Sequence, residues 1–195
     1  MKLKKIIAVI LLSIIISACA TTRINTYSVN GKETICNGEN VNLGSVVILP
    51  EVAWRKNQKE PKKREEMAIN EIKRAFKSMS CGNVTLPNGV KELSNWSGIT
   101  EDKLIEQLSV EGFDTVVIIR IEELTPRLNI TFSVPFLWSG ANEADFHIKV
   151  ISIKMGKILN DMRIQRITGG LFHVRPAEWS KEELYLAIRE IVKGN

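Results

Sequence analysis

The stretch TVVIIRI at residues 115–121 decides the fold, because five of its seven residues are valine or isoleucine, which makes it the most strand-like part of the chain. An earlier run, SVVILP at residues 45–50, is apolar and closed by a proline, which suits a short strand buried on both faces. Between these runs the pattern changes to a helical one. The order strand, helix, turn, helix, strand predicts parallel strands joined by helical crossovers.

Two amphipathic helices are predicted between these strands. The first starts near Pro61, and its apolar residues recur at a spacing of three or four, at Ala68, Ile72 and Phe76. The second is expected to be capped by Thr100 and to end at Gly112. A brief strand around residues 84–86 separates them.

The second half of the chain predicts an antiparallel meander. Apolar and polar residues alternate from Leu128 to Phe136, a period of two that is typical of a sheet with one solvated face. Another strand is expected at residues 146–150, and a hairpin turn at residues 153–158 leads into a third, which carries Met162 and Ile164.

The chain closes with a predicted helix. Ser180 and Glu183 have the spacing of a capping box, and Ile188 continues a buried apolar stripe. The whole pattern predicts an α/β to α+β fold with a single mixed sheet. Its order is β-α-β-α-β, then the antiparallel meander and the C-terminal helix, with the helices packed on the sheet.

The first twenty residues predict an export and lipidation signal. Three lysines precede an apolar run at residues 6–16 that is too short for a membrane-spanning helix, for which roughly 20 residues are needed. The sequence Ile16-Ser17-Ala18-Cys19 then resembles the bacterial lipobox, which implies cleavage before Cys19 and lipid on its sulfur. Ala20, rather than aspartate, implies the outer membrane. An ordinary secretory signal with an incidental cysteine is the alternative.

The expected domain organisation follows from this signal. Residues 1–18 are a lipoprotein signal peptide, residues 19–44 a lipidated tether with a short hairpin or coil, and residues 45–195 one periplasmic α/β domain. A tether of about 25 residues would reach at most ~85 Å. Such a reach makes it difficult for the domain to cross the cell wall to an inner-membrane partner.

With Cys19 acylated, Cys36 and Cys81 remain as an even pair in an oxidising compartment, and a disulfide is expected between them. Closing a loop of about 46 residues would stabilise the fold by roughly 4 kcal/mol. Two unpaired thiols or an intermolecular bridge are the alternatives.

Composition and motifs exclude several classes of function. Three of the positive charges behind the net charge of +5 lie in the signal peptide, so the charge gives no support for nucleic-acid binding. We find no nucleophile elbow, phosphate loop or dinucleotide motif, and therefore predict no catalytic residue and no cofactor. Asp145 and His147 share a strand face, but no third ligand for a metal is visible, and exposed polar positions are the expected explanation.

Two segments are candidates for binding a partner. The aromatic turn Phe136-Leu137-Trp138 either closes the core at a strand end or forms an exposed apolar patch, which would mark docking or membrane contact. The second candidate is a basic segment, which either is a solvated loop and helix start or binds anionic lipid or an acidic partner. Its members are Lys56, Lys59, Lys62, Lys63 and Arg64.

The order of elements over residues 45–193 resembles a group of periplasmic α/β domains. The group includes the TolB N-terminal domain, the curli secretion lipoprotein CsgG and lipoprotein activators of penicillin-binding proteins. The matching motifs are residues 46–50, residues 114–118 and the hairpin at residues 148–159. The resemblance implies a non-catalytic module that docks on other proteins or oligomerises, and fold alone does not fix function.

We therefore expect an outer-membrane lipoprotein, anchored by Cys19 and facing the periplasm, that binds an unidentified envelope protein or scaffolds it. The alternatives are an oligomeric secretion or pore component resembling CsgG and a regulator of a cell-wall synthase. An enzyme with dispersed catalytic residues is a further alternative, which the scarcity of histidines disfavours.

Overall fold

The protein is described from a computed structural model. The described residues are 21–30, 43–56, 58–77, 83–85, 99–130, 138–171 and 179–193. In chain order the elements are β1 (Thr21–Asn30), β2 (Ser45–Val52), α2 (Pro61–Lys77), β3 (Asn83–Thr85), α3 (Glu101–Val110), β4 (Thr115–Ile130), β5 (Trp138–Ser152), β6 (Lys157–Leu171) and α4 (Trp179–Lys193).

The strands form one mixed sheet of six strands in the order β1-β6-β5-β4-β2-β3. β2 runs parallel to both β3 and β4, so the two predicted helical crossovers are present. The β4–β5, β5–β6 and β1–β6 pairs are antiparallel, which confirms the meander. The structure therefore confirms the predicted class, a mixed α+β sheet with helices packed on it.

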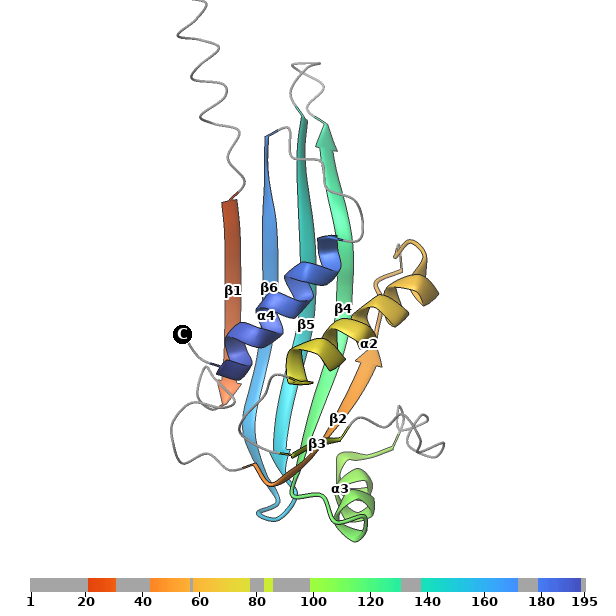
Figure 1. Ribbon diagram of the computed structural model, residues 1–195, viewed down its shortest axis with the longest axis vertical. Helices are drawn as coiled ribbons and strands as arrows, with labels where there is room; N and C mark the ends of the chain where they lie inside the picture. The colour runs from red at the N-terminus through yellow and green to blue at the C-terminus, as the bar shows by residue number, and fades with distance from the viewer. Residues whose placement is uncertain are drawn as a thin grey trace, which may run out of the picture.

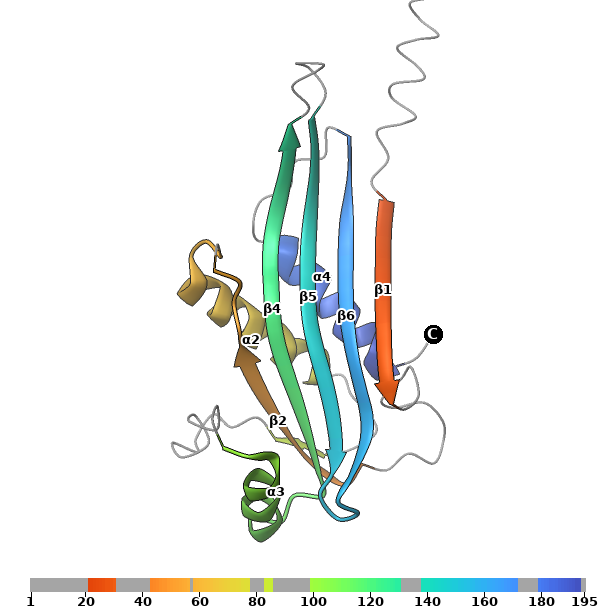
Figure 2. The same cartoon turned by 180° about the vertical axis from the view of Figure 1, so that it is seen from behind.

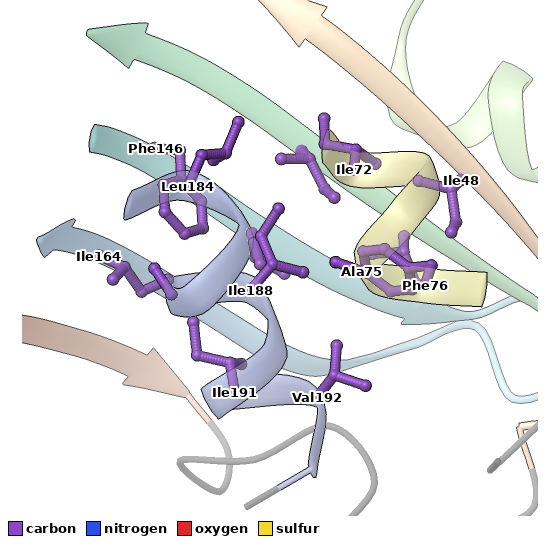
Figure 3. Close-up of a cluster of buried hydrophobic side chains, with 14 of the residues drawn as sticks. Ile48, Ile72, Ala75, Phe76, Phe146, Ile164, Leu184, Ile188, Ile191 and Val192 are labelled. Atoms are coloured by element: carbon purple, nitrogen blue, oxygen red, sulfur yellow. The ribbon is translucent and has the colours of Figure 1, made fainter. Parts of the chain in front are cut away.

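The main core lies between the sheet and the helices α2 and α4, which cross the same face side by side (Figure 1). Inward residues of the central strands, such as Ile48 and Phe146, meet Phe76 of α2 and Ile188 of α4, and all four are at most 1% exposed (Figure 3). Burial of such side chains stabilises the fold by about 1.5–3 kcal/mol each.

A smaller core lies on the opposite face, at the foot of the sheet. There Leu104 and Leu108 of α3 pack against Val47, Leu49 and neighbouring residues of β4 and β5. Figure 2 shows that α3 covers only this lower end. Within the described residues, no helix combines the length and the apolar composition that a membrane span needs.

The start of β2 is held against the start of β4. Gly44 has a φ of +66°, a conformation that glycine adopts without strain, and a Cβ there would overlap Asp114. The backbone N–H of Ser45 donates to the Asp114 carboxylate at 2.8 Å, and the Thr115 hydroxyl donates to the carbonyl of Leu43 at 2.8 Å. These contacts set the parallel register of the two central strands.

The strand β4 differs from the prediction in length. The Val/Ile stretch and the alternating stretch were expected to be separate strands, but β4 continues from Thr115 to Ile130. A bulge between Ile121 and Glu123 shifts the register on β5. After this bulge Leu124 again faces the main core, so one strand accommodates both patterns.

The predicted tether is wrong for residues 21–30, which form β1 and pair with β6 along its length. Ten residues that were expected to link the lipid anchor to the domain are therefore part of the sheet. The reason is that Thr21–Ser28 are exposed, so this edge strand lacks the apolar alternation that marks a half-buried strand. Its threonines, Ile24 and Tyr27 still favour extended backbone.

The predicted cap of α4 is also wrong. The helix already starts at Trp179, and Ser180 lies inside it, fully buried. The Glu183 carboxylate accepts hydrogen bonds from Arg166 and Thr168 of β6, each at 2.8 Å, instead of returning to the helix start. The capping-box spacing therefore serves a buried polar contact between helix and sheet. The Thr100 side chain likewise makes no capping hydrogen bond at the start of α3.

Glu71 of α2 predicts a pH dependence of stability. Burial raises the pKa of its carboxyl, although Arg74 lies 2.7 Å away and opposes the shift. The folded state thus holds this proton more tightly than the unfolded chain. The stability that the protonated Glu71 carboxyl contributes is fully present below the pKa that Glu71 has in the unfolded chain. This contribution is lost as the pH rises through the raised pKa that Glu71 has in the folded protein.

We therefore expect Glu71→Gln, which stays neutral, to gain free energy of unfolding relative to wild type as the pH is raised from about 4 to about 7. Urea titrations at both pH values measure this difference. Glu66→Gln, at an exposed position of the same helix, is the matched control and should show no comparable gain. A Glu71→Gln advantage that shrinks as the pH rises would contradict the account.

Candidate functional site

The sheet face opposite α2 and α4 is the candidate functional surface. Above α3, no described helix covers this face (Figure 2). The strand register places polar side chains in rows across it: Tyr27 of β1 lies beside Arg163 of β6, which lies beside His147 of β5, which lies beside Arg120 of β4. We call this surface the open face.

A buried carboxylate organises the centre of the open face. Asp145 of β5 is 1% exposed, and its Oδ2 accepts hydrogen bonds from Arg55 at 2.5 Å and from Arg163 at 2.8 Å. Arg163 also donates through Nε to Oδ1 at 3.0 Å, so its guanidinium is bound at two points. Hydrogen bonding to Asp145 raises the pKa of Arg163.

Two glutamates of the β4 bulge extend this network. Glu122 lies 2.8 Å from Arg163, and Glu123 lies 3.6 Å from Arg55. Arg55 comes from the segment after β2, whose backbone pairs with β4 through Ala53 and Arg55. The network therefore fixes this segment across the sheet and holds both guanidinium planes in place.

A cavity of about 510 Å³ opens over the network. It is lined by Tyr27, Arg55, Asp145, His147, Arg163 and Gln165. Asp145 already binds both arginines. The remaining lining groups are therefore chiefly N–H and O–H donors.

The rest of the open face is also charged and paired. His147 Nε2 lies 2.5 Å from Asp161, and Lys149 lies 2.5 Å from Glu101 of α3. Asp145 and His147 do share a face, as predicted, but Asp145 is buried rather than exposed. Among the residues that the structure describes, no group of three or more His, Cys, Asp or Glu side chains could hold a metal ion.

The predicted basic segment is divided by the structure. The side chains of Lys56, Lys59, Lys62 and Lys63 are exposed. Arg64 as a partner-binding residue is wrong: it is 4% exposed, and its guanidinium donates to the carbonyls of Leu124 and Lys59. Its place one turn into α2, on the side facing the sheet, accounts for its burial.

Several predicted site residues lie outside the described residues. These are the lipidation site, the expected disulfide pair and two residues of the aromatic turn: Cys19, Cys36, Cys81, Phe136 and Leu137. Trp138 is the first residue of β5, and only its backbone is described. Their predicted roles stay predictions.

Sequence reasoning missed Arg55 and Arg163. A usable signal was present for Arg163, because Met162 and Ile164 were expected to face the core, which puts Asp161, Arg163 and Gln165 on the opposite face. Nothing in the sequence pairs Arg55 with Asp145, 90 residues away.

Neither a family model nor a curated protein sequence matches the chain. Among solved structures it is similar to a PelC dodecamer from Paraburkholderia phytofirmans, with 10% identity over 91% of this chain and 100% of that chain and a TM-score of 0.44. It is also similar to lipoprotein GNA1162 from Neisseria meningitidis, with 11% identity, coverage of 76% and 96%, and a TM-score of 0.42. At such scores these likenesses carry no statement about the function of this chain.

Proposed function

We propose that the chain is a lipid-anchored protein of the bacterial cell envelope that binds a partner protein through the open face. The observation that carries the binding role is the buried Asp145 network with its cavity on a sheet face that the described helices leave uncovered. A polar, hydrogen-bonded surface of this kind suits a non-obligate protein interface, which is about as polar as the rest of a protein surface.

The resemblance of residues 16–19 to a lipobox supports the anchor. The position of β1 determines how close to the membrane the domain would lie. Only Ala20 separates Cys19 from Thr21, the first residue of β1. Two residues span about 7 Å at most. Lipid on Cys19 would therefore hold the sheet close to the membrane instead of releasing it on a long tether.

If Cys19 is anchored in the membrane, the strand register indicates which end of the domain would face that membrane. Thr21 pairs with Gly169, which pairs with Ala141, which pairs with Arg127. The upper ends of β4 and β5 extend beyond this level to the pair Ile130 and Trp138 (Figure 1). In the proposed arrangement these strand ends point toward the membrane, and the open face is reachable from the side.

This arrangement argues against a regulator of an inner-membrane synthase. An outer-membrane lipoprotein of that kind needs length to cross the cell wall, and the residues that were expected to supply it are paired in the sheet. A partner at or near the same membrane fits better.

For the anchor, we expect Cys19→Ser to abolish incorporation of radiolabelled palmitate. The physical reason is that the cysteine sulfur is the atom that would carry the diacylglycerol, whose two acyl chains are enough for stable anchoring. Cys36→Ser, which leaves the lipobox intact, is the matched control. Incorporation of palmitate into the Cys19→Ser protein would contradict the anchor.

For the partner, a photo-crosslinking amino acid is placed at Tyr27, on the open face, and separately at Arg189, an exposed residue of α4 on the opposite side. After irradiation of intact cells, the Tyr27 position should give a defined crosslinked protein and the Arg189 position should not. Crosslinks to the same protein from Arg189 alone would place the interface on the helical side and overturn the proposal.

Self-association is a second candidate, and one observation favours it. β1 is an edge strand, exposed over Thr21–Ser28, with Arg23 as its only charged residue. Long edges with little charge can pair with another strand. Sedimentation of the purified Cys19→Ser protein tests this: a concentration-dependent oligomer that is lost in Thr26→Pro supports edge pairing, and a monomer at all concentrations contradicts it.

A further inference from the structure

We propose that the cavity over Asp145 binds a carboxylate group of its ligand. This inference rests on the proposed function only in so far as the open face is the binding surface. The structural basis is the pair of guanidinium groups of Arg55 and Arg163, which a single buried carboxylate holds at the floor of the cavity.

The two arginines are held in place, but their existing contacts do not use all of their hydrogen-bond donors. Their side chains remain 36% and 46% exposed, while Asp145 beneath them is 1% exposed. Each guanidinium has five N–H donors, and the contacts with Asp145, Glu122 and Glu123 leave some of them facing solvent. Donors held in place in this way lose little conformational entropy when a ligand binds.

The other lining groups add donors. Tyr27 is 61% exposed, lines the cavity and carries a hydroxyl group. The Gln165 amide donates one hydrogen to Glu143 at 2.7 Å and has a second one. Such a donor set, with its one carboxylate already bound, is suited to an oxygen anion.

The charge around the cavity favours a monoanion over a dianion. Arg55 and Arg163 contribute two positive charges, and Asp145, Glu122 and Glu123 contribute three negative charges, so the remaining N–H donors, rather than a positive net charge, would hold an anion. Glu122 and Glu123, which lie against the same guanidiniums, would repel a phosphate dianion more strongly than a carboxylate. Carboxylate also matches the planar fork of arginine for two parallel hydrogen bonds.

The ligand carboxylate has two possible sources, a chain terminus or small free acid, and an acidic side chain of a partner. The test titrates the purified, full mature chain carrying Cys19→Ser while the arginine Nε–Hε signals are followed by NMR. The probes are N-acetylalanine, its neutral amide, inorganic phosphate, and N-acetylglutamate blocked as its α-amide.

We expect saturable shifts of the Arg163 signal with a dissociation constant on the order of 1 mM for at least one of the two carboxylate probes. Saturation by N-acetylalanine alone assigns a terminal or free acid, and saturation by the blocked glutamate alone assigns an acidic side chain. The inference is overturned if neither acid saturates, if the neutral amide acts equally, or if phosphate binds as tightly as the acids.

Variants separate the site from general electrostatics. Arg163→Gln should weaken binding by about tenfold or more, whereas Arg120→Gln, an exposed arginine on the same face outside the cavity, should leave it unchanged. If Arg163→Gln does not fold, the exposed Tyr27→Ala provides the test, with an expected loss of about threefold. Equal weakening in the Arg120 variant would overturn the inference.

The two proposals can fail separately. Carboxylate binding is measured on the purified protein without lipid or partner, whereas crosslinking at Tyr27 is measured in cells. Crosslinks in cells without carboxylate saturation leave the proposed function and remove this inference. Saturation without crosslinks leaves a small-acid site and removes the protein partner.

Discussion

Phe146→Ala should lower the free energy of unfolding by about 3–5 kcal/mol, the cost typical of deleting a buried phenylalanine. Phe146 is fully buried beneath α4, where Figure 3 shows it beside Leu184. Its neighbours across the sheet, Ile121 and Ile164, are also in the main core. Because the whole domain is expected to be stable by only about 5–15 kcal/mol, this one change consumes much of that margin.

Urea denaturation followed by circular dichroism measures the effect on the purified Cys19→Ser protein. Tyr27→Ala is the matched control, since it deletes an aromatic ring that is 61% exposed on the open face. It should change the free energy of unfolding by less than about 0.5 kcal/mol. Similar losses for both variants would mean that α4 does not form the main core with this sheet face.

Asp145→Asn should be the second most damaging change, although it keeps the size of the side chain. Removing one partner of a buried ion pair costs about 3–5 kcal/mol, and the exposure of Arg55 and Arg163 reduces this to roughly 2–3 kcal/mol. The variant removes the carboxylate that both guanidiniums share and leaves Glu122 and Glu123 to balance their charge.

Denaturation at low and high salt measures this loss and its electrostatic part. Glu66→Gln, at an exposed position on α2, is the control for the removal of one negative charge and should stay within about 0.5 kcal/mol of wild type. A double-mutant cycle of Asp145→Asn with Arg163→Gln should give a coupling energy of about 1 kcal/mol or more. An Asp145→Asn protein as stable as wild type would show that the network does not hold the segment after β2.

The central part of the fold could be predicted from local patterns. Residues 45–50 and 115–121 were expected as strands, and they form neighbouring strands of the sheet that run parallel to each other. Their patterns are clear because burial on both faces or under a helix demands apolar residues at regular spacing. The helix from Pro61 follows the same logic, and its stripe at Ala68, Ile72 and Phe76 is buried.

The edges of the fold could not be predicted in the same way. β1 pairs with β6 through backbone hydrogen bonds while its side chains remain exposed, so its sequence carries no burial pattern. The capping-box spacing of Ser180 and Glu183 was misleading, because Glu183 instead binds Arg166, which the sheet brings to it. Contacts across the fold overrode a local signal in this case.

The open face shows the same limit. The period of two placed Asp145 and His147 on one face, and the structure agrees. Burial of Asp145 depends on Arg55 and Arg163, which reach it from 90 and 18 residues away. Topology creates this network, and no local pattern in the sequence indicates it.

The central claim is that the open face is covered by a partner in the cell, and labelling of single cysteines tests it most directly. In a background with Cys36→Ser and Cys81→Ser, cysteine is placed at Tyr27 or at Arg189, and maleimide labelling rates are compared between intact cells and the purified protein. We predict that labelling at position 27 is at least about tenfold slower in cells while labelling at position 189 is unchanged. Equal labelling of position 27 in cells and in the purified protein would contradict the account.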